Sequence, residues 1–127
     1  MNDEVFKIVI VGAGVGGLAT AKYALGSSIG PLVILEQKED LGGLWNPEAG
    51  YSWNTMIANN SKYNCSFMGF PLSKDAPIYP GGKDFFLYLK AYAKQFGIDK
   101  RTLFGCRVKE VQKMSNGLYE ITYEQNS

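Results

Sequence analysis

Histidine is absent from this chain of 127 residues, and only two cysteines occur. Without histidine there is no serine or cysteine triad of the usual kind, and the most common general base is missing. Two cysteines alone do not make a zinc site, so we expect no metal site. Cys65 and Cys106 are instead expected to be reduced thiols in a cytoplasmic protein. Any catalysis must therefore come mostly from a bound cofactor.

The chain also lacks an excess of charge and a long apolar run. Thirteen Lys and Arg against twelve Asp and Glu give a net charge of +1, so neither nucleic acid nor an acidic membrane is expected as a partner. The acidic start Met1–Glu4 is not typical of a signal peptide, and no stretch is long enough to span a bilayer. We expect a cytoplasmic location, with membrane attachment of a longer protein left open. Hydrophobic residues make up 46% of the chain, enough for one folded domain.

The most informative stretch is Phe6–Glu36, which predicts a βαβ unit with a dinucleotide-binding fingerprint. Its first run, Phe6–Val11, is almost entirely apolar, as is typical of a strand buried on both faces of a parallel sheet. Three glycines follow at the fingerprint spacing. A tight turn is expected at Gly12, close approach of a pyrophosphate at Gly14, and close packing of the next helix at Gly17. That helix would offer N–H groups and a partial positive charge to the phosphates.

An acidic residue, Glu36, follows the second strand of this unit, Leu32–Leu35. A carboxylate there can accept hydrogen bonds from the ribose hydroxyls of an adenosine half, and it would repel a 2′-phosphate. The first ligand is therefore expected to be FAD or NAD rather than NADP. The alternative is a glycine-rich turn without a ligand, which the surrounding strands, helix and acid disfavour.

The remainder of the chain predicts a long loop region, a helix and further strands. Residues 36–82 keep no helical or strand period, and we expect ligand-embracing loops with a helical turn around Leu72–Asp75. Apolar residues at helical spacing predict a helix over Lys83–Phe96. Leu103–Cys106 predicts a third parallel strand, and Arg107–Glu124 a β-hairpin. A doubly wound sheet normally continues further, so this α/β fold is expected to be incomplete at its C-terminus.

Several motifs beyond the fingerprint make the chain resemble the flavin-containing monooxygenase family. The match runs from Val5 to about Tyr123 and comprises Gly12-x-Gly14-x-x-Gly17-Leu18, Glu36, Gly42-Gly43-Leu44-Trp45, Asn59-x-x-Lys62, Phe70-Pro71, Tyr79-Pro80 and Tyr88-Leu89-x-x-Tyr92. Their combined order is far more specific than a glycine-rich loop alone. The resemblance implies a Rossmann-like FAD-binding domain of the glutathione-reductase type, with a parallel sheet plus a β-hairpin.

The resemblance also implies which residues hold the adenosine half of FAD. Gly12, Gly14 and Gly17 would hold the pyrophosphate. Glu36 would bind the adenosine ribose, helped by Gln37 as the neighbouring polar group. A solvated strand end is the plainer interpretation of Gln37.

Residues later in the chain would surround the rest of the cofactor. Leu44 and Trp45 would cover the ribityl and pyrophosphate region, and the backbone at Val108 would meet the adenine edge. Asn59 would lie beside the flavin ring as the catalytic residue, since an amide can hydrogen-bond a peroxide without titrating. The plainer interpretations are ordinary core packing for Trp45 and a turn residue for Asn59. Lys62 is expected to be solvated.

The reaction implied by the resemblance is an oxygenation that uses NADPH and O2. NADPH reduces FAD, a flavin C4a-hydroperoxide forms, and an amine nitrogen or a sulfur of a small molecule takes the distal oxygen. The family's second glycine-rich loop, for NADPH, does not occur in this sequence. Residues 1–127 are therefore expected to be the N-terminal part of an FAD-binding domain, without the NADPH-binding domain and inactive alone. A non-catalytic FAD- or ADP-binding or interaction module completed by a partner chain, and an NAD-binding domain, are the alternatives.

Overall fold

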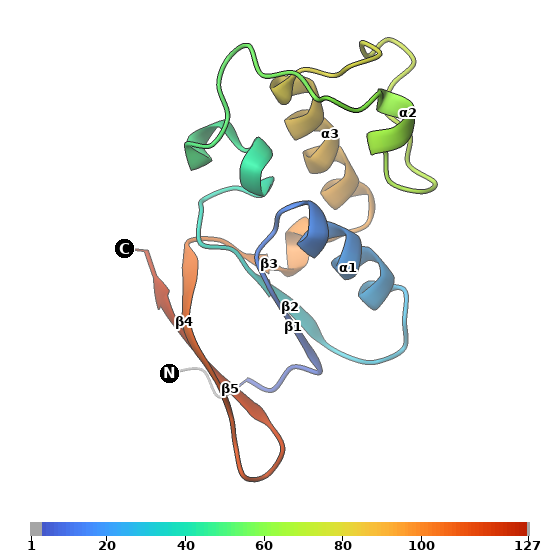
Figure 1. Cartoon of the computed structure of the whole chain (residues 1–127). Coiled ribbons are helices and arrows are strands. Elements are labelled where there is room, and N and C mark those ends of the chain that lie inside the picture. The colour runs from blue at the N-terminus through green and yellow to red at the C-terminus, as the bar shows by residue number, and fades with distance from the viewer. Residues whose placement is uncertain (1–3, 127) are drawn as a thin grey trace.

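The computed structural model describes residues 4–126, which form a three-stranded parallel sheet, a two-stranded antiparallel hairpin and several helices (Figure 1). The sheet has the order β1-β2-β3, and its strands are β1 (Ile8–Val11), β2 (Leu32–Leu35) and β3 (Thr102–Leu103). The hairpin consists of β4 (Cys106–Lys113) and β5 (Tyr119–Gln125). The α-helices are α1 (Val15–Leu25), α2 (Lys62–Cys65) and α3 (Gly82–Gln95). Three short 3-10 turns cover Gly43–Trp45, Pro47–Ala49 and Asp99–Arg101.

Strand β2 is buried on both faces. In β1, where the apolar run predicts the same burial, Ile10 is buried but Val11 is 58% exposed. Successive side chains of a strand point to opposite faces. Leu32 and Ile34 pack into the main core with the helices, and Val33 and Leu35 pack against Cys106 and the hairpin. Figure 1 shows α1 and α3 side by side over the sheet, with the hairpin on its other side. The sheet is therefore covered on both faces at its centre.

The two long helices bury the faces that their sequence periods predict. In α1, Leu18 and Ala21 are fully buried, and Leu25 packs against the same core. Helix α3 begins one residue earlier than expected and buries a largely aromatic stripe made of Phe85, Tyr88, Leu89, Tyr92 and Ala93. These buried residues pack into the main core of the chain.

Two expectations about the remaining segments are wrong. The third parallel strand covers only Thr102–Leu103, because Gly105 adopts a left-handed φ of +68° and turns the chain, so that Cys106 begins the hairpin instead. Within the described chain, Leu72–Asp75 contains a turn at Lys74 and Asp75 but no helix, and the short α-helix of the loop region is Lys62–Cys65.

Within residues 4–126 both edges of the parallel sheet, β1 and β3, are unpaired. Strand β1 pairs only with β2 within residues 4–126, and Val11 is 58% exposed. These edges do not test the expectation of an incomplete sheet, because every open sheet has two edges. None of the helices in the described part of the chain combines the length and apolar character needed to cross a membrane.

Candidate functional site

The fingerprint loop forms the tight connection between β1 and α1. Gly12 has a φ of +96°, a conformation that glycine adopts without strain, and its N–H donates to the Leu35 carbonyl at 2.8 Å. A Cβ placed on Gly17 would lie 2.0 Å from the Gly12 carbonyl oxygen and 3.5 Å from the Ile10 side chain. The tight turn and the close packing expected at these two glycines are both present.

Helix α1 starts beside this loop with its first N–H groups available. Gly14 is the N-cap residue, and in the described structure the first turn has neither a side-chain cap nor an acidic residue. The first N–H groups of any helix lack intrahelical acceptors, and the N-terminus carries a partial positive charge. The arrangement therefore suits an anionic group such as a pyrophosphate.

The carboxylate of Glu36 binds the fingerprint loop directly. Its side chain is buried, with 5% exposed. One oxygen, Oε2, accepts a hydrogen bond from the Ala13 N–H at 2.8 Å, and Oε1 accepts one from the Lys38 N–H at 2.8 Å. Each carboxylate oxygen can accept a second hydrogen bond. Glu36 thus ties the end of β2 to the turn after β1, a role that the sequence did not predict, and it keeps capacity for a further donor.

A second glycine pair packs against the fingerprint loop. The Gly42 N–H donates to the Ala13 carbonyl at 2.9 Å. A Cβ on Gly43 would lie 2.9 Å from the Gly14 Cα, so the two backbones meet where no side chain fits. A Cβ on Gly42 would lie 2.8 Å from the Phe86 ring of α3. The Gly42-Gly43 pair is therefore required to seat this loop between the fingerprint and α3.

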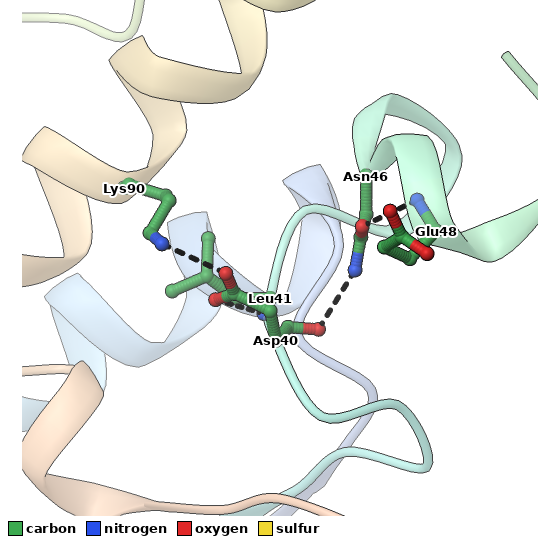
Figure 2. Close-up of polar contacts among 5 residues, drawn as sticks. All are labelled: Asp40, Leu41, Asn46, Glu48 and Lys90. Atoms are coloured by element: carbon green, nitrogen blue, oxygen red, sulfur yellow. Dashed lines mark hydrogen bonds and ion pairs between the residues drawn. The ribbon is translucent and has the colours of Figure 1, made fainter.

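Polar side chains hold the same loop in shape, as Figure 2 shows. Asn46 is 2% exposed; its amide Nδ2 donates to the Asp40 carbonyl at 3.2 Å, and its Oδ1 accepts from the Glu48 N–H at 2.9 Å. The Asp40 carboxylate accepts from the Leu41 N–H and pairs with Lys90 of α3 at 2.7 Å. That ion pair is partly exposed, so we expect it to contribute little to stability.

Replacing Asn46 by alanine is expected to lower the free energy of unfolding by about 1 to 3 kcal/mol. The substitution removes the partners of one backbone carbonyl and one backbone N–H, both in partly buried contacts. The measurement is the urea midpoint of the purified chain, with the exposed Asn60→Ala variant as control, for which a change below about 0.5 kcal/mol is expected. Equal midpoints for the two variants would show that Asn46 does not hold the loop.

The two residues expected to cover a ligand differ in exposure. Leu44 is 53% exposed, whereas Trp45 is half-buried, with its ring 4.6 Å from that of Phe85. Core packing therefore accounts for one side of Trp45. Because both residues follow Gly43, they lie next to the fingerprint loop.

Gln37 and Val108 lie near the end of β2, on the hairpin side of Glu36. Gln37 is exposed and borders a polar hollow of about 270 Å³ that is lined by Gln37, Lys38, Glu39, Arg107 and Asn126. The Cys106 N–H donates to the Glu36 carbonyl at 2.8 Å, which places the start of β4 here. Val108 packs its side chain against the core cluster of Val33 and Leu35. In the hairpin Val108 pairs with Tyr123 of β5, next to an irregularity in the ladder between Val108 and Glu110.

Asn59 lies on an exposed loop at the N-terminal end of α3. The Ala58 N–H donates to the Pro80 carbonyl at 2.9 Å, and the Lys62 N–H donates to the Ile78 carbonyl at 2.6 Å. Asn59 therefore sits between two hydrogen bonds to the segment that leads into α3. The same end of α3 carries Phe85, against which Trp45 packs.

The expectation that Lys62 is solvated is wrong. Its side chain is only 8% exposed, and the ammonium group donates to the carbonyls of Ser73, Lys74 and Ala76 at 3.2, 2.8 and 2.8 Å. Carbonyl groups occur at every residue, so no pattern of side chains could have indicated this contact. Lys62 instead organises the loop that follows α2.

Tyr88 fixes the other part of that loop. Its hydroxyl donates to the Phe70 carbonyl at 2.5 Å and accepts from the Phe67 N–H at 2.7 Å. Burial raises the pKa of the Tyr88 phenol, and the N–H of Phe67 opposes this in part.

Burial also raises the pKa of both free thiols, Cys65 and Cys106, which fits unreactive structural cysteines.

The family model and the curated relatives that match this chain are all flavin-dependent monooxygenases. A family model described as flavin-binding monooxygenase-like matches residues 5–126. The chain is 32% identical over 131 residues to dimethylaniline monooxygenase [N-oxide-forming] 2 of Oryctolagus cuniculus, and the match covers 95% of this chain and 24% of that protein. The chain thus spans about a quarter of the length of the curated relatives it matches.

Two solved structures have the same fold at low sequence identity. S-allyl-L-cysteine S-oxygenase from Allium sativum superposes with a TM-score of 0.80 at 20% identity, over 93% of this chain and 32% of that one. OTEMO in complex with FAD and NADP superposes with a TM-score of 0.79 at 21% identity, over 99% of this chain and 24% of that one. The fold is therefore shared along almost all of the chain.

Proposed function

The chain belongs to the flavin-binding monooxygenase-like family, and we propose that it binds FAD as the flavin-binding part of a monooxygenase. The observation that carries this proposal is the uncapped N-terminus of α1 beside a buried carboxylate at the end of β2. The first feature suits a pyrophosphate and the second suits an adenosine ribose. Among the flavin cofactors, FAD is the one that carries both a pyrophosphate and an adenosine ribose.

The residues present fit the adenosine half of FAD. In this proposal Gly12, Gly14 and Gly17 let the pyrophosphate approach the α1 backbone. Glu36 accepts from a ribose hydroxyl with the capacity left after its two backbone contacts. The exposed Gln37 supplies a neighbouring polar group. No 2′-phosphate is accommodated, because the Glu36 carboxylate would repel it.

The remaining candidate residues contact the reactive half and the adenine edge. Leu44 and Trp45 cover the ribityl chain and exclude water from it, and the Val108 backbone meets the adenine edge. Asn59 contacts the flavin ring and offers an amide that hydrogen-bonds without changing protonation state. FAD, when bound, supplies the electron transfer and the oxygen chemistry, and the protein supplies orientation and electrostatics.

For the complete enzyme we propose an oxygenation of small-molecule amines or sulfur compounds that uses NADPH and O2. The names of two similar proteins support both nitrogen and sulfur as acceptors, since one forms N-oxides and the other is an S-oxygenase. Residues 1–127 would supply the first part of the FAD-binding domain, and NADPH would bind to a part of the enzyme outside these residues. By itself the chain is then expected not to oxidise NADPH.

The test is a flavin-retention experiment on the purified chain. After incubation with FAD and gel filtration, we expect the protein fraction to keep the visible absorption of oxidised flavin and to show no NADPH-driven oxygen uptake. A chain that is folded by circular dichroism but stays colourless in excess FAD would overturn the flavin-binding proposal. Oxygen uptake on addition of NADPH would contradict the assignment of NADPH binding to another part.

A further inference from the structure

The side chain of Lys62 is used to its full hydrogen-bonding capacity inside the protein. An ammonium group has three donors and no acceptor, and the Lys62 ammonium faces three backbone carbonyls, those of Ser73, Lys74 and Ala76. Burial of a charged group is costly unless its hydrogen bonds are replaced. The three carbonyls therefore take the place of the water that this ammonium gives up, and the loop must stay in one conformation to provide them.

The surrounding elements are too short to hold this region without such contacts. Helix α2 has only four residues, and a helix of that length is not stable by itself. The Ser66 hydroxyl donates to the Lys62 carbonyl and accepts from the Leu72 N–H at 3.1 Å. Ser66 is the residue that ends α2, and Tyr88 of α3 holds residues 67–70. The contacts of Lys62 are therefore the ones that hold residues 73–76.

The loop held by Lys62 leads directly to the segment that holds Asn59. The Ile78 carbonyl accepts from the Lys62 N–H, and the Pro80 carbonyl accepts from the Ala58 N–H. Asn59 lies between these two bonds, in the segment 58–62, which is hydrogen-bonded to the segment 78–80. Ile78 comes two residues after Ala76, whose carbonyl accepts from the Lys62 side chain. The backbone and the side chain of Lys62 thus fix both ends of residues 76–78, and through them the loop of Asn59.

We infer that Lys62 is the positioning residue for Asn59: it acts on the flavin-ring half of the site through the loop 73–80 and does not touch the ligand. This inference rests on the proposed contact between Asn59 and the flavin. The adenosine half depends on other elements, namely β1, α1, β2 and Glu36. A change at Lys62 therefore perturbs the flavin ring and leaves most of the binding affinity in place.

The shape of the contact distinguishes lysine from arginine. Three convergent carbonyls match a compact ammonium group, whereas a guanidinium is planar and presents its donors in a fork. Lys62→Arg should therefore fail to restore the loop even though it keeps the charge. Lys74→Met is the matched control, because Lys74 is an exposed lysine of the same loop.

The first measurement is amide hydrogen exchange, which needs no ligand. In Lys62→Met we expect exchange at residues 58 and 62 to become at least about tenfold faster, while the amides of β1 and β2 keep their protection. Lys74→Met should match the wild type. Unchanged exchange at residue 58 in Lys62→Met would overturn the inference, whatever the protein does with FAD. Where Lys62→Met does not fold, Lys62→Gln, whose amide can serve two of the carbonyls, is measured and should show an intermediate increase.

The second measurement separates the flavin ring from the adenosine half. In Lys62→Met and Lys62→Arg we expect the visible spectrum of bound FAD to shift as it does in Asn59→Ala, while the Kd for FAD rises less than about tenfold. The double variant with Asn59→Ala should show no larger shift than Asn59→Ala alone, because Lys62 acts through Asn59. A wild-type spectrum in the Lys62 variants, or additive shifts in the double variant, would overturn the positioning role. A wild-type chain that takes up no FAD overturns the proposed function and the flavin part of this inference together, and the exchange result still decides whether Lys62 holds the Asn59 loop.

Discussion

Replacement of Gly17 by alanine is expected to destabilise the chain by about 3 kcal/mol or more, the upper end of what overpacking costs. The added Cβ would lie 2.0 Å from the Gly12 carbonyl oxygen and 3.0 Å from its carbon. These are backbone atoms, and Gly12 is held by its hydrogen bond to the Leu35 carbonyl at 2.8 Å. Helix α1 would have to move away from the loop, which also separates the α1 N–H groups from a bound pyrophosphate. Urea denaturation and FAD retention measure the two consequences.

The neighbouring Gly16 provides the control for this substitution. Both glycines lie in the first turn of α1, but among residues 4–126 no atom outside the immediate helix lies within 4 Å of a Cβ at Gly16. Gly16→Ala is therefore expected to stabilise the chain by about 0.5 to 1 kcal/mol, the usual gain for alanine over glycine inside a helix. Equal urea midpoints for Gly16→Ala and Gly17→Ala would show that close packing at Gly17 is not what the fold requires.

The elements that could be predicted from the sequence are those that local periodicity determines. Strand β2 consists of four consecutive apolar residues between Pro31 and Glu36, and such a run has no polar face to expose to solvent. The fingerprint glycines restrict the backbone so strongly that the strand, the turn and the start of α1 follow from their spacing. The stripe on α3 repeats at the helical period from Phe85 to Ala93 in a helix of fourteen residues, which is long enough to be unambiguous.

The contacts that could not be predicted join side chains to distant backbone groups. Lys62 binds carbonyls 11 to 14 residues further along, and Glu36 binds the N–H of Ala13, 23 residues earlier. Backbone groups carry no residue identity, so the sequence contains no signal for such pairs. The predicted third strand is too long for a related reason. Extended residues at Phe104 and Cys106 fit either the parallel sheet or the hairpin, and the left-handed φ of Gly105 separates the two.

Replacement of Glu36 by alanine is expected to lower the free energy of unfolding by about 2 to 3 kcal/mol, because a buried N–H left without an acceptor costs about 1 to 3 kcal/mol. Ala13 is fully buried, so its N–H cannot turn to water once the Glu36 carboxylate is gone. The Lys38 N–H is less deeply placed and contributes less. Glu110→Ala, at an exposed carboxylate on β4, is the control and should change stability by less than about 0.5 kcal/mol. Equal losses in the two variants would contradict the buried contact.

The same substitution can separate the structural role of Glu36 from its proposed ribose contact. If Glu36 acts only by shaping the loop, its loss should weaken the binding of inorganic pyrophosphate and of ADP by the same factor, since both use the N-terminus of α1. A hydrogen bond from a ribose hydroxyl to a carboxylate is worth about 1.5 to 3 kcal/mol, which corresponds to roughly a tenfold to hundredfold larger loss for ADP. We expect this larger loss for ADP in Glu36→Ala. The measurement is calorimetry without urea, at a temperature where the wild type and Glu36→Ala are both folded. Equal factors for the two ligands would remove Glu36 from the ribose site and leave it as the residue that closes the fingerprint loop.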